Sequence, residues 1–391
     1  PLSFIFYTQT CQESCMNITL IISTLSSGGA ERVLVGLANW WASHGANVTI
    51  ITYSGGDDFY VPVPSVRRLR LDLRRNSSNL FDTVRFFIWR IITLRRVIKS
   101  TKPGCVVSFL DQTNILTLLA CLGTSLRVVV SERIDPRFYP IRPSWGLLRD
   151  MLYRRADTVV VQTESLRPWA EQRALPTRVA VIPNALDEER IKLMDSVDIS
   201  SHRSDGYRIV AMGRMDDHQK GFDLLIQACA KILPAHINWS LELIGDGQLR
   251  SQLEQLADQN GIRQQVHFHG RLKNPFAVMK GADIFVLSSR VEGFPNVLLE
   301  AMGLGVAVVS FDCPSGPSEL IIPHVSGLLV PTEDVDALAA AIQSLMVDPA
   351  RRAAMGAEAF RVRERYAESK IMGEWSRVTG VKNSMFTESA T

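Results

Sequence analysis

Residues 281–305 read GADIFVLSSRVEGFPNVLLEAMGLG, and the rest of the chain is organised around this stretch. Residues 284–287 are apolar with a β-branched start, which predicts a short buried strand. Residues 288–294 are polar and contain glycine, which indicates a loop. Pro295 suits the first turn of a helix, where its missing N–H costs nothing, and residues 297–302 form the expected helix body. The stretch therefore predicts a strand, a loop and a helix.

Two carboxylates lie in this unit. Glu292 is at the tip of the expected loop, and Glu300 follows Asn296 by one helical turn on the same face. The N–H groups of Phe294, Asn296 and Val297 are expected to be free at the helix start, a position that favours anions. An ordinary β–α unit with two solvated glutamates would show the same pattern. The residues alone leave both interpretations open.

The segment from Glu292 to Glu300 resembles the Glu-x7-Glu signature of retaining glycosyltransferases with the GT-B fold, the glycosyl transferases group 1 or family 4 type. In that family the first glutamate contacts the donor sugar and the second holds the nucleotide ribose. The resemblance implies these roles for Glu292 and Glu300. It also implies that the residues between them border the donor, namely Gly293, Phe294, Pro295, Asn296 and Val297.

Length and charge limit the possibilities. The 391 residues suggest about two domains, and 46% hydrophobic with 21% charged residues is a globular composition. Residues 1–183 contain 22 lysines and arginines against 13 acidic residues, whereas the remainder contains 21 against 27. A basic first half could face phosphates, nucleic acid or an anionic membrane.

The six cysteines show no zinc-type spacing. Cys105, Cys121 and Cys229 lie in apolar segments and are predicted to be buried thiols in a reducing cytoplasm. Cys11 and Cys15 could bind a metal, but nothing downstream completes a site, so no metal is expected.

The start of the chain shows no leader pattern. Residues 1–15 lack a basic region and are too interrupted for a signal peptide. We expect Met16 to be the natural start and residues 1–15 to be a disordered or non-native extension. The sequence contains no run of 18 or more apolar residues, so we expect no transmembrane helix. The expected location is the cytoplasm, peripheral on the inner face of the cytoplasmic membrane.

A β–α–β unit follows. Residues 17–24 and 47–53 are predicted strands, and residues 31–44 carry apolar side chains at helical spacing. This starts a doubly wound sheet, but the turn lacks the GxGxxG pattern of a dinucleotide-binding loop. Gly28 and Gly29 would let backbone N–H groups approach a phosphate, or they only make a tight turn. Many GT-B enzymes have a similar pair facing the donor diphosphate, so the resemblance implies donor binding.

Strands and helices alternate until a polar segment, and the alternation restarts after it. This predicts an α/β protein with two Rossmann-like doubly wound domains facing across a cleft. Residues 183–187, PNALD, resemble a Pro-Asn-Gly-Val-Asp motif at the family's domain crossover, with Ala185 in place of glycine. The expected division is residues 16–187 as acceptor domain, 188–206 as linker, 207–366 as nucleotide-sugar donor domain, and 367–391 as a C-terminal helix or tail that could cross back to the first domain.

A loop with two cations follows the first strand of the second half. Arg214 and Lys220 suit a diphosphate, because arginine offers a planar fork of donors and lysine a point charge; a solvated basic loop would look the same. The loop resembles the family's Gly-Arg-x5-Lys-Gly element, which implies that both residues stabilise the departing nucleoside diphosphate. With Glu292 they are the predicted catalytic residues. Gly245 and Gly247 match the family's Gly-x-Gly after a strand and are predicted to border the nucleotide.

The first domain departs from the family in one respect. Many relatives carry a histidine after the strand that corresponds to residues 106–109, and this chain has none there. No catalytic histidine can be carried over. Asp111 and Glu132 end neighbouring strands, where doubly wound sheets place ligand groups. Either could meet the acceptor hydroxyl as a base, or both only cap helices.

A basic and aromatic stretch surrounds the helix expected at residues 80–99. Residues 66–99 hold ten lysines and arginines against Asp72 and Asp82. This helix could lie on an anionic membrane, or it could pack its aromatic residues on the sheet and leave its arginines in water.

These observations predict a retaining GT-B glycosyltransferase. It would move a sugar from a nucleoside diphosphate sugar, expected to be a UDP-sugar, to a lipid-linked glycan in surface polysaccharide biosynthesis, as lipopolysaccharide or exopolysaccharide. No cofactor and no nucleic acid partner are expected. A non-catalytic sugar-nucleotide binding protein and a GT-B epimerase remain alternatives, while the missing GxGxxG counts against an NAD-type dehydrogenase.

Overall fold

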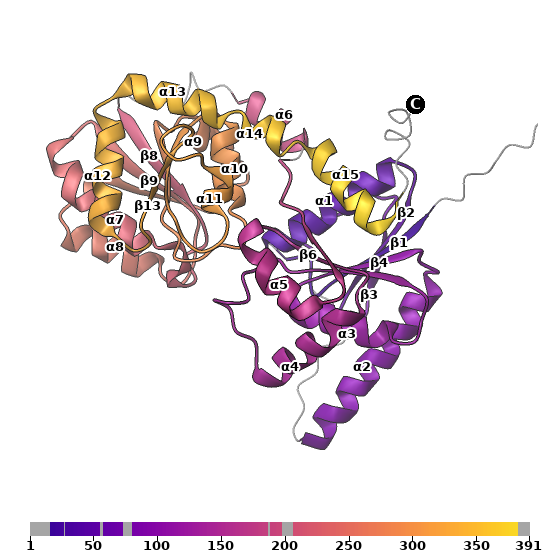
Figure 1. The fold of residues 1–391 in the computed structure, drawn as a ribbon. Helices are drawn as coiled ribbons and strands as arrows, with labels where there is room; N and C mark the ends of the chain where they lie inside the picture. Colours follow the sequence, from indigo (N-terminus) through magenta and orange to yellow (C-terminus); the bar gives the residue numbers. More distant parts are fainter. Residues whose placement is uncertain are drawn as a thin grey trace, which may run out of the picture.

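The computed structural model describes residues 16–26, 28–54, 58–72, 80–186, 188–197 and 206–381. The chain forms two lobes, each built on a parallel sheet with helices on both faces (Figure 1). This confirms the predicted α/β class and the two Rossmann-like domains. The expected N-terminal extension, Cys11 and Cys15 lie outside the described residues, and so do Asp187 and residues 198–205 of the expected linker.

The first sheet has seven parallel strands in the order β3-β2-β1-β4-β5-β6-β7. These strands are β1 (Asn17–Ile22), β2 (Asn47–Thr52), β3 (Arg67–Arg70), β4 (Cys105–Phe109), β5 (Arg127–Ser131), β6 (Thr158–Val161) and β7 (Arg178–Val181). Its helices are α1 (Gly29–Ser43), α2 (Leu80–Ser100), α3 (Asp111–Cys121), α4 (Pro143–Leu152) and α5 (Arg167–Ala174). The strand order reverses between β1 and β4, and open α/β sheets bind ligands in the crevice at such a point.

The second sheet repeats this plan with six parallel strands in the order β10-β9-β8-β11-β12-β13. They are β8 (Tyr207–Met212), β9 (Trp239–Ile244), β10 (Val266–Gly270), β11 (Ile284–Leu287), β12 (Ala307–Phe311) and β13 (Leu328–Val330). The helices of this lobe are α7 (Phe222–Ile232), α8 (Arg250–Gln259), α9 (Phe276–Lys280), α10 (Asn296–Gly303), α11 (Pro317–Leu320), α12 (Val335–Met346), α13 (Pro349–Ala359) and α14 (Val362–Arg365).

The organising stretch occupies the reversal point of the second sheet. Its strand is β11, which pairs with β8 on one side and β12 on the other and is buried along its whole length. Its helix is α10, and Pro295 directly precedes this helix as its N-cap residue instead of lying in the first turn. The predicted strand–loop–helix unit is therefore correct, with its helix start displaced by one residue.

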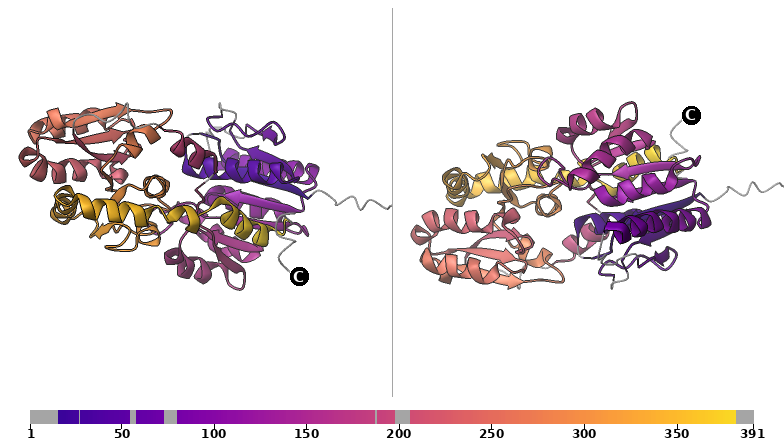
Figure 2. Two further views of the ribbon diagram at one scale, coloured as in Figure 1. Left: turned by 90° about the horizontal axis from the view of Figure 1, so that it is seen from above. Right: turned by 90° about the horizontal axis from the view of Figure 1, so that it is seen from below.

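Two chain crossings join the lobes. The first is α6 (Glu188–Asp195), a helix inside the segment that the sequence indicated only as a polar linker. The second leads from α14 to α15 (Glu368–Thr379), whose Met372 and Trp375 are buried in the same core as β1 and α1. Figures 1 and 2 show this yellow helix lying on the indigo-to-magenta lobe. The crossings touch where Leu186 donates its N–H to the carbonyl of Tyr366 at 2.9 Å.

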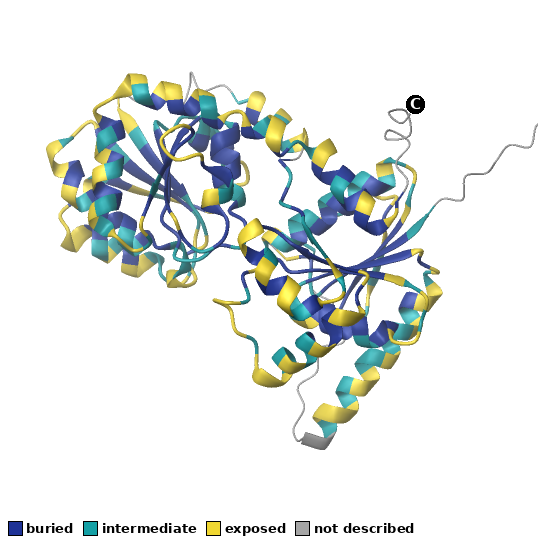
Figure 3. Cartoon of the chain, viewed as in Figure 1, coloured by how far each residue is buried: buried dark blue, intermediate teal, exposed yellow. Residues whose placement is uncertain are grey.

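Helices cover both faces of each sheet, so the strands form the buried centre of each lobe (Figure 3). Cys105, Cys121 and Cys229 are buried thiols, as predicted, and Cys313 is also buried. Among the described helices, none is both long and apolar enough to cross a bilayer.

Candidate functional site

Loops at the carboxyl ends of the strands of both sheets meet between the lobes. From the second lobe come the loop after β8, which carries Arg214 and Lys220, and the loop between β11 and α10, which carries Glu292. From the first lobe come the turn before α1, the segment after β5 and the segment after β7. Side chains link the two sets directly, since Asn184 donates to Asn296 at 2.7 Å. The meeting point joins the reversal regions of both sheets, where the fold predicts a ligand.

Glu292 and Lys220 form an ion pair at the base of this region. Lys220 Nζ lies 2.6 Å from Glu292 Oε1, and the Ser289 hydroxyl donates to the same oxygen at 2.6 Å. The Glu292 side chain is buried, so its charge requires such partners. The structure thus brings together two of the three predicted catalytic residues.

Arg214, the third, is exposed and makes no ion pair or hydrogen bond within the described ranges. It lies close enough to Tyr139, from the first lobe, for its charge to lower the tyrosine pKa. Burial and the carboxylates of Asp217 and Glu292 outweigh it and raise the pKa of Tyr139 to about 12. Tyr139, which the sequence did not single out, therefore stands near the cationic loop and near Glu292.

Glycines set the close approach of these loops. Gly245 has a φ of 135°, and a side chain there would place Cβ 1.8 Å from the carbonyl oxygen of Gly213. A Cβ on Gly293 would lie 2.7 Å from the carbonyl oxygen of Arg133 in the first lobe. Gly247 likewise packs on the backbone of Met215. Gly245 and Gly247 therefore support the cationic loop, and Gly293 allows the first lobe to touch the loop of Glu292.

Glu300 is held by cations from outside its own lobe. It is 1% exposed, and Oε1 accepts from Arg32 of α1 and from Arg190 of α6, each at 2.8 Å. Glu300 Oε2 is buried and has no hydrogen-bond partner. A buried carboxylate oxygen without a donor is costly, so this atom is suited to accept from a ligand hydroxyl. The sequence did not indicate either arginine.

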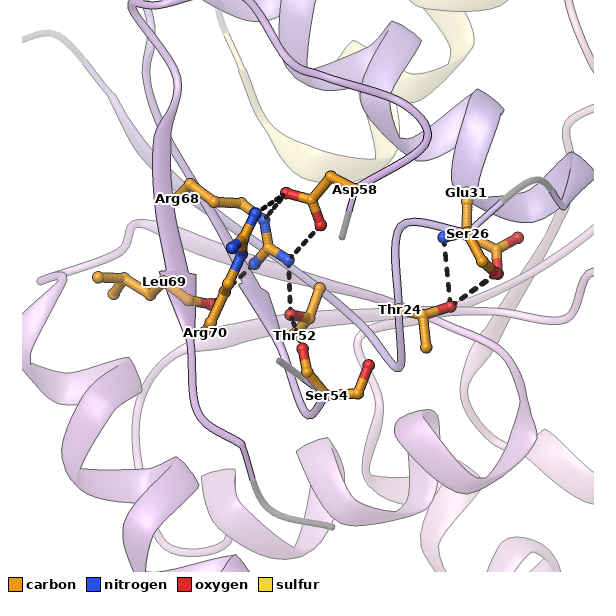
Figure 4. Close-up of polar contacts among 9 residues, drawn as sticks. All are labelled: Thr24, Ser26, Glu31, Thr52, Ser54, Asp58, Arg68, Leu69 and Arg70. Atoms are coloured by element: carbon orange, nitrogen blue, oxygen red, sulfur yellow. Dashed lines mark hydrogen bonds and ion pairs between the residues drawn. The ribbon is translucent and has the colours of Figure 1, made fainter. Parts of the chain in front are cut away.

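The start of α1 brings Gly28 and Gly29 to the interface between the lobes. A Cβ on Gly29 would lie 3.2 Å from Asn296 Nδ2, so the glycine turn faces the start of α10. The Glu31 carboxylate lies against this turn, since a Cβ on Gly28 would meet its Oε2 at 2.1 Å, and it accepts from the hydroxyls of Thr24 and Ser26 at 3.1 and 3.2 Å (Figure 4). The α1 start therefore already has one carboxylate of its own, which complements the positive end of the helix.

The start of α10 differs in one detail from the expectation. The N–H of Asn296 is not free, because it donates to the carbonyl oxygen of Phe294 at 3.0 Å. The side chain of Asn296 is instead the group at this helix start that contacts the first lobe, through Asn184. Asn184 belongs to the PNALD segment, so two motifs 112 residues apart meet here.

The side of the site that first-lobe residues form is called the first-lobe wall here. It contains a buried carboxylate, Glu132, and a buried guanidinium, Arg133, which are neighbours in sequence. The Glu132 carboxylate accepts from the Tyr153 hydroxyl, and burial raises its pKa to about 7. Arg133 donates to Asn184 and lies with its guanidinium carbon 4.6 Å from the centre of the Phe109 ring; burial lowers its pKa to about 9. Asp111 is half-buried, accepts from the N–H of Gln112, and its charge further raises the pKa of Glu132. Both candidate acceptor carboxylates therefore lie on one wall, with Asp111 the more accessible.

A turn after β5 fastens this wall to the second lobe. Asp135 is fully buried and accepts from Arg137 at 2.7 Å. The hydroxyl of Ser315 lies 2.7 Å from the Asp135 carboxylate and 3.0 Å from the carbonyl oxygen of Glu292. The turn presents Tyr139 toward the second lobe from a fixed base. Within the described ranges no group of three possible metal ligands gathers.

Known proteins resemble most of the chain. Residues 27–190 match the model of Glycosyltransferase Family 4, and residues 195–362 match that of Glycosyl transferases group 1. A similar protein of Campylobacter jejuni is 30% identical over 94% of this chain and 100% of its own length; its name is GalNAc-alpha-(1->4)-GalNAc-alpha-(1->3)-diNAcBac-PP-undecaprenol alpha-1,4-N-acetyl-D-galactosaminyltransferase. The lipopolysaccharide core biosynthesis glycosyltransferase LpsD of Rhizobium meliloti is 28% identical over 86% of this chain and 91% of its own.

Solved structures agree on the fold. Anabaena HepE in complex with UDP matches with a TM-score of 0.76 and 20% identity over 93% of this chain and all of its own. The same protein in complex with UDP-glucose matches with a TM-score of 0.75 over 99% of its length. Two facing Rossmann-like domains of the GT-B type are thereby confirmed for this chain.

Proposed function

The chain belongs to the glycosyltransferases of group 1 and family 4, and from this premise we propose that it transfers a sugar from a UDP-sugar to a lipid-linked glycan with retention of anomeric configuration. The observation that carries the proposal is the pairing of Lys220 with the buried Glu292 at the reversal point of the second sheet. The Campylobacter relative is named for a lipid-linked acceptor, and HepE is solved with UDP-glucose. Both names support the two substrates proposed here.

The proposed reaction breaks the bond between the anomeric carbon and the diphosphate oxygen. Negative charge then develops on the leaving diphosphate, and positive character on the sugar. Lys220 and Arg214 stabilise the diphosphate, since preorganised charges act most strongly in a site that excludes water. Glu292, steadied by Lys220 and Ser289, lies against the sugar. The acceptor oxygen forms the new bond on the face that the diphosphate leaves, and its proton passes to the leaving phosphate oxygen.

Glu300 is proposed to bind the ribose. Its Oε2 is buried without a partner, and a ribose hydroxyl would supply the missing donor. The glycine turn at Gly28 and Gly29 and the start of α10 would enclose the diphosphate. Gly245, Gly247 and Gly293 shape this space through the loops they support.

The acceptor is proposed to enter along the first-lobe wall. Asp111 is the better placed of the two carboxylates there, because Glu132 is almost fully buried and engaged by Tyr153. In this proposal Asp111 orients the acceptor hydroxyl, while Glu132 lies buried behind it and does not contact the acceptor.

We further propose that α2 and α4 dock on an anionic membrane. Apolar side chains are exposed on both helices, and they are Val84, Ile88, Trp89 and Ile92 of α2 with Leu147 and Met151 of α4. The rings of Phe87 of α2 and Trp145 of α4 pack edge to face with 5.7 Å between their centroids. Both helices lie at the lower edge of the first lobe (Figures 1 and 3). Arg85, Arg96 and Lys99 are exposed beside this surface. Exposed apolar residues flanked by cations suit a headgroup layer.

Other arginines of the basic stretch are engaged elsewhere. Arg68 and Arg70 pair with Asp58 at 3.1 and 2.9 Å (Figure 4). Arg95 donates to the carbonyl oxygens of Ala120 and Leu122. The membrane surface therefore relies on fewer cations than the sequence suggested.

Transfer assays test the catalytic proposal. The purified protein should transfer sugar from one of a panel of UDP-, GDP- and ADP-sugars to an undecaprenyl-diphosphate glycan, and NMR of the product should show the anomeric configuration of the donor. Binding without transfer to any acceptor would favour a sugar-nucleotide binding protein. Conversion of the free donor into its epimer would favour an epimerase, and an inverted product would remove the retaining mechanism.

Vesicle co-sedimentation tests the membrane surface. Binding to phosphatidylglycerol vesicles should fall as salt rises and should weaken when Arg85, Arg96 and Lys99 are replaced by Gln. The same replacement at the exposed second-lobe residues Arg271 and Lys273 is the matched control and should leave binding unchanged. Equal binding to neutral vesicles, or equal loss in the control, would contradict membrane docking.

A further inference from the structure

The side chain of Asn184 is oriented by two donors. It is buried between the lobes, and its Oδ1 accepts from Arg133 and from Gln162 Nε2, the latter at 3.0 Å. An amide has one oxygen that accepts and one nitrogen that donates. Since the oxygen faces Arg133 and Gln162, the Nδ2 group of Asn184 must face the other way. It donates to Asn296 Oδ1 at 2.7 Å.

This arrangement in turn orients Asn296. Its oxygen is occupied by Asn184, so its Nδ2 group faces away from that contact. Among the residues that the structure describes, Asn296 Nδ2 has no hydrogen-bond partner. It lies 3.2 Å from the position that a Cβ on Gly29 would take, so it faces the glycine turn at the start of α1. A donor without a partner is thus held between two helix starts.

We propose that Asn296 Nδ2 donates a hydrogen bond to the diphosphate of the nucleotide, and that Arg133, Gln162 and Asn184 are positioning residues that orient it. This rests on the proposed function, because it takes the glycine turn and the α10 start to enclose a nucleoside diphosphate. Phosphate oxygens only accept, so an amide that presented its oxygen would repel them. The four side chains form a relay that turns the correct end of Asn296 toward the ligand.

The burial of Arg133 is consistent with this role. No carboxylate lies within ion-pair distance of it in the described part of the chain, and its Nε has no partner. Burying a guanidinium without a carboxylate partner is costly, and its partners in the first lobe are all neutral: the side chains of Asn184 and Ser131 and the Phe109 ring. As the first member of the relay, the cation polarises the amides that follow it. Because Asn296 belongs to the other lobe, the relay is complete only when the lobes meet as they do here.

Asn184→Asp is the variant that separates orientation from structure. A carboxylate at this position still accepts from Arg133 and Gln162, and it gives Arg133 an ion pair. It cannot donate, so Asn296 would turn its Nδ2 toward the new carboxylate and present its oxygen to the phosphate. Calorimetric titration with UDP should show about a tenfold or greater loss of affinity, whereas the melting temperature should not fall. In an Asn296→Ala background the same substitution should change the UDP affinity less than about twofold, because the side chain through which Asn184 acts on the ligand is absent.

Asn39→Asp is the matched control. Asn39 lies in α1, and its Oδ1 accepts from the N–H of Val63, a bond that Asp would keep. This control adds the same charge to the first lobe and should leave UDP affinity unchanged. Unchanged affinity in Asn184→Asp, an equal loss in both backgrounds, or a loss that follows a lower melting temperature would each overturn the relay. If the unmodified protein binds none of UDP, GDP and ADP, the proposed donor itself fails; if it binds one and the two substitutions are additive, only the relay fails.

Discussion

The two walls of the interface between the lobes treat buried charge in different ways. On the second-lobe wall each buried carboxylate has a cation: Lys220 lies 2.6 Å from Glu292, and Arg32 lies 2.8 Å from Glu300. On the first-lobe wall the buried Asp135 is paired with Arg137, but Glu132 and Arg133, which are adjacent in sequence and both buried, have no ion-pair partner among the described residues. Their pKa values move toward neutrality instead, up to about 7 for Glu132 and down to about 9 for Arg133.

The difference separates fixed charge from adjustable charge. A paired carboxylate keeps its charge and its position when a ligand arrives, which suits a wall that must stabilise a leaving group. An unpaired buried group can gain or lose a proton near neutral pH, or it can form a pair with a group that the ligand or the other lobe supplies. Substitutions on the second-lobe wall are therefore expected to lower turnover. Substitutions on the first-lobe wall are expected to change the pH dependence of stability and the orientation of side chains.

The largest effect should follow from breaking the pair on the second-lobe wall. Lys220→Ala removes the charge proposed to stabilise the leaving diphosphate, and we expect turnover to fall by roughly 10²–10³. It also leaves Glu292 buried without a cation, so the melting temperature should fall. Steady-state transfer assays and thermal unfolding measure the two effects separately.

Arg214→Ala is the matched control for this substitution. Arg214 is exposed and unpaired within the described residues, so its removal should lower turnover without lowering the melting temperature. Lys220→Arg, which keeps the charge, should recover stability. Transfer at the parent rate in either alanine variant would show that the cation concerned has no part in stabilising the diphosphate.

The next effect concerns Glu300, whose cations come from outside its lobe. Glu300→Ala should weaken UDP binding by roughly 1.5–3 kcal/mol, the value of a hydrogen bond to a charged group. Calorimetry with UDP and with 2′-deoxy-UDP provides the measurement. If the carboxylate binds the ribose, the parent protein should bind 2′-deoxy-UDP more weakly than UDP. Glu300→Ala should then lower the affinity for 2′-deoxy-UDP only slightly further. Equal losses for both nucleotides would place the effect elsewhere, for example in the released charges of Arg32 and Arg190.

The second-lobe wall was largely predictable from sequence, and the reason is local. Glu292 and Glu300 stand in one continuous strand–loop–helix unit, and Lys220 stands in the loop of the adjacent strand, so spacing and periodicity locate them. Their resemblance to a known signature depends on the same continuity. The sheets, the buried thiols and the first β–α–β unit were predictable for the same reason, because each rests on hydrophobic periodicity.

The first-lobe contacts were not predictable, because they arise only when distant segments meet. Arg32 is 268 residues from Glu300, and Arg190 is 110 residues away. The PNALD segment was recognisable, but nothing in it indicates that Asn184 faces Asn296. Strand β3 could not be predicted either, because Arg67–Arg70 has no apolar alternation; it is held by pairing with β2 and by Asp58. In each case a tertiary partner, absent from the local pattern, decides the structure.

The effect expected on the first-lobe wall is a dependence of stability on pH. The folded-state pKa of Glu132 is raised from 4.5 to about 7, mainly by burial, so the folded protein holds this proton more tightly than the unfolded chain does. The stabilisation is fully present below pH 4.5 and is lost as the pH rises through 7.

Glu132→Gln resembles the protonated form, keeps an acceptor for the Tyr153 hydroxyl, and cannot ionise. At about 1.4 kcal/mol per pKa unit, the unfolding free energy of the variant relative to the parent should rise by roughly 2–3 kcal/mol between pH 5 and pH 8. Urea unfolding at several pH values measures this difference, and Glu171→Gln on the exposed side of α5 is the control that should show no such trend. A constant difference across this range would mean that Glu132 is charged in the folded protein at pH 5, and that the first-lobe wall holds fixed charge as the second-lobe wall does.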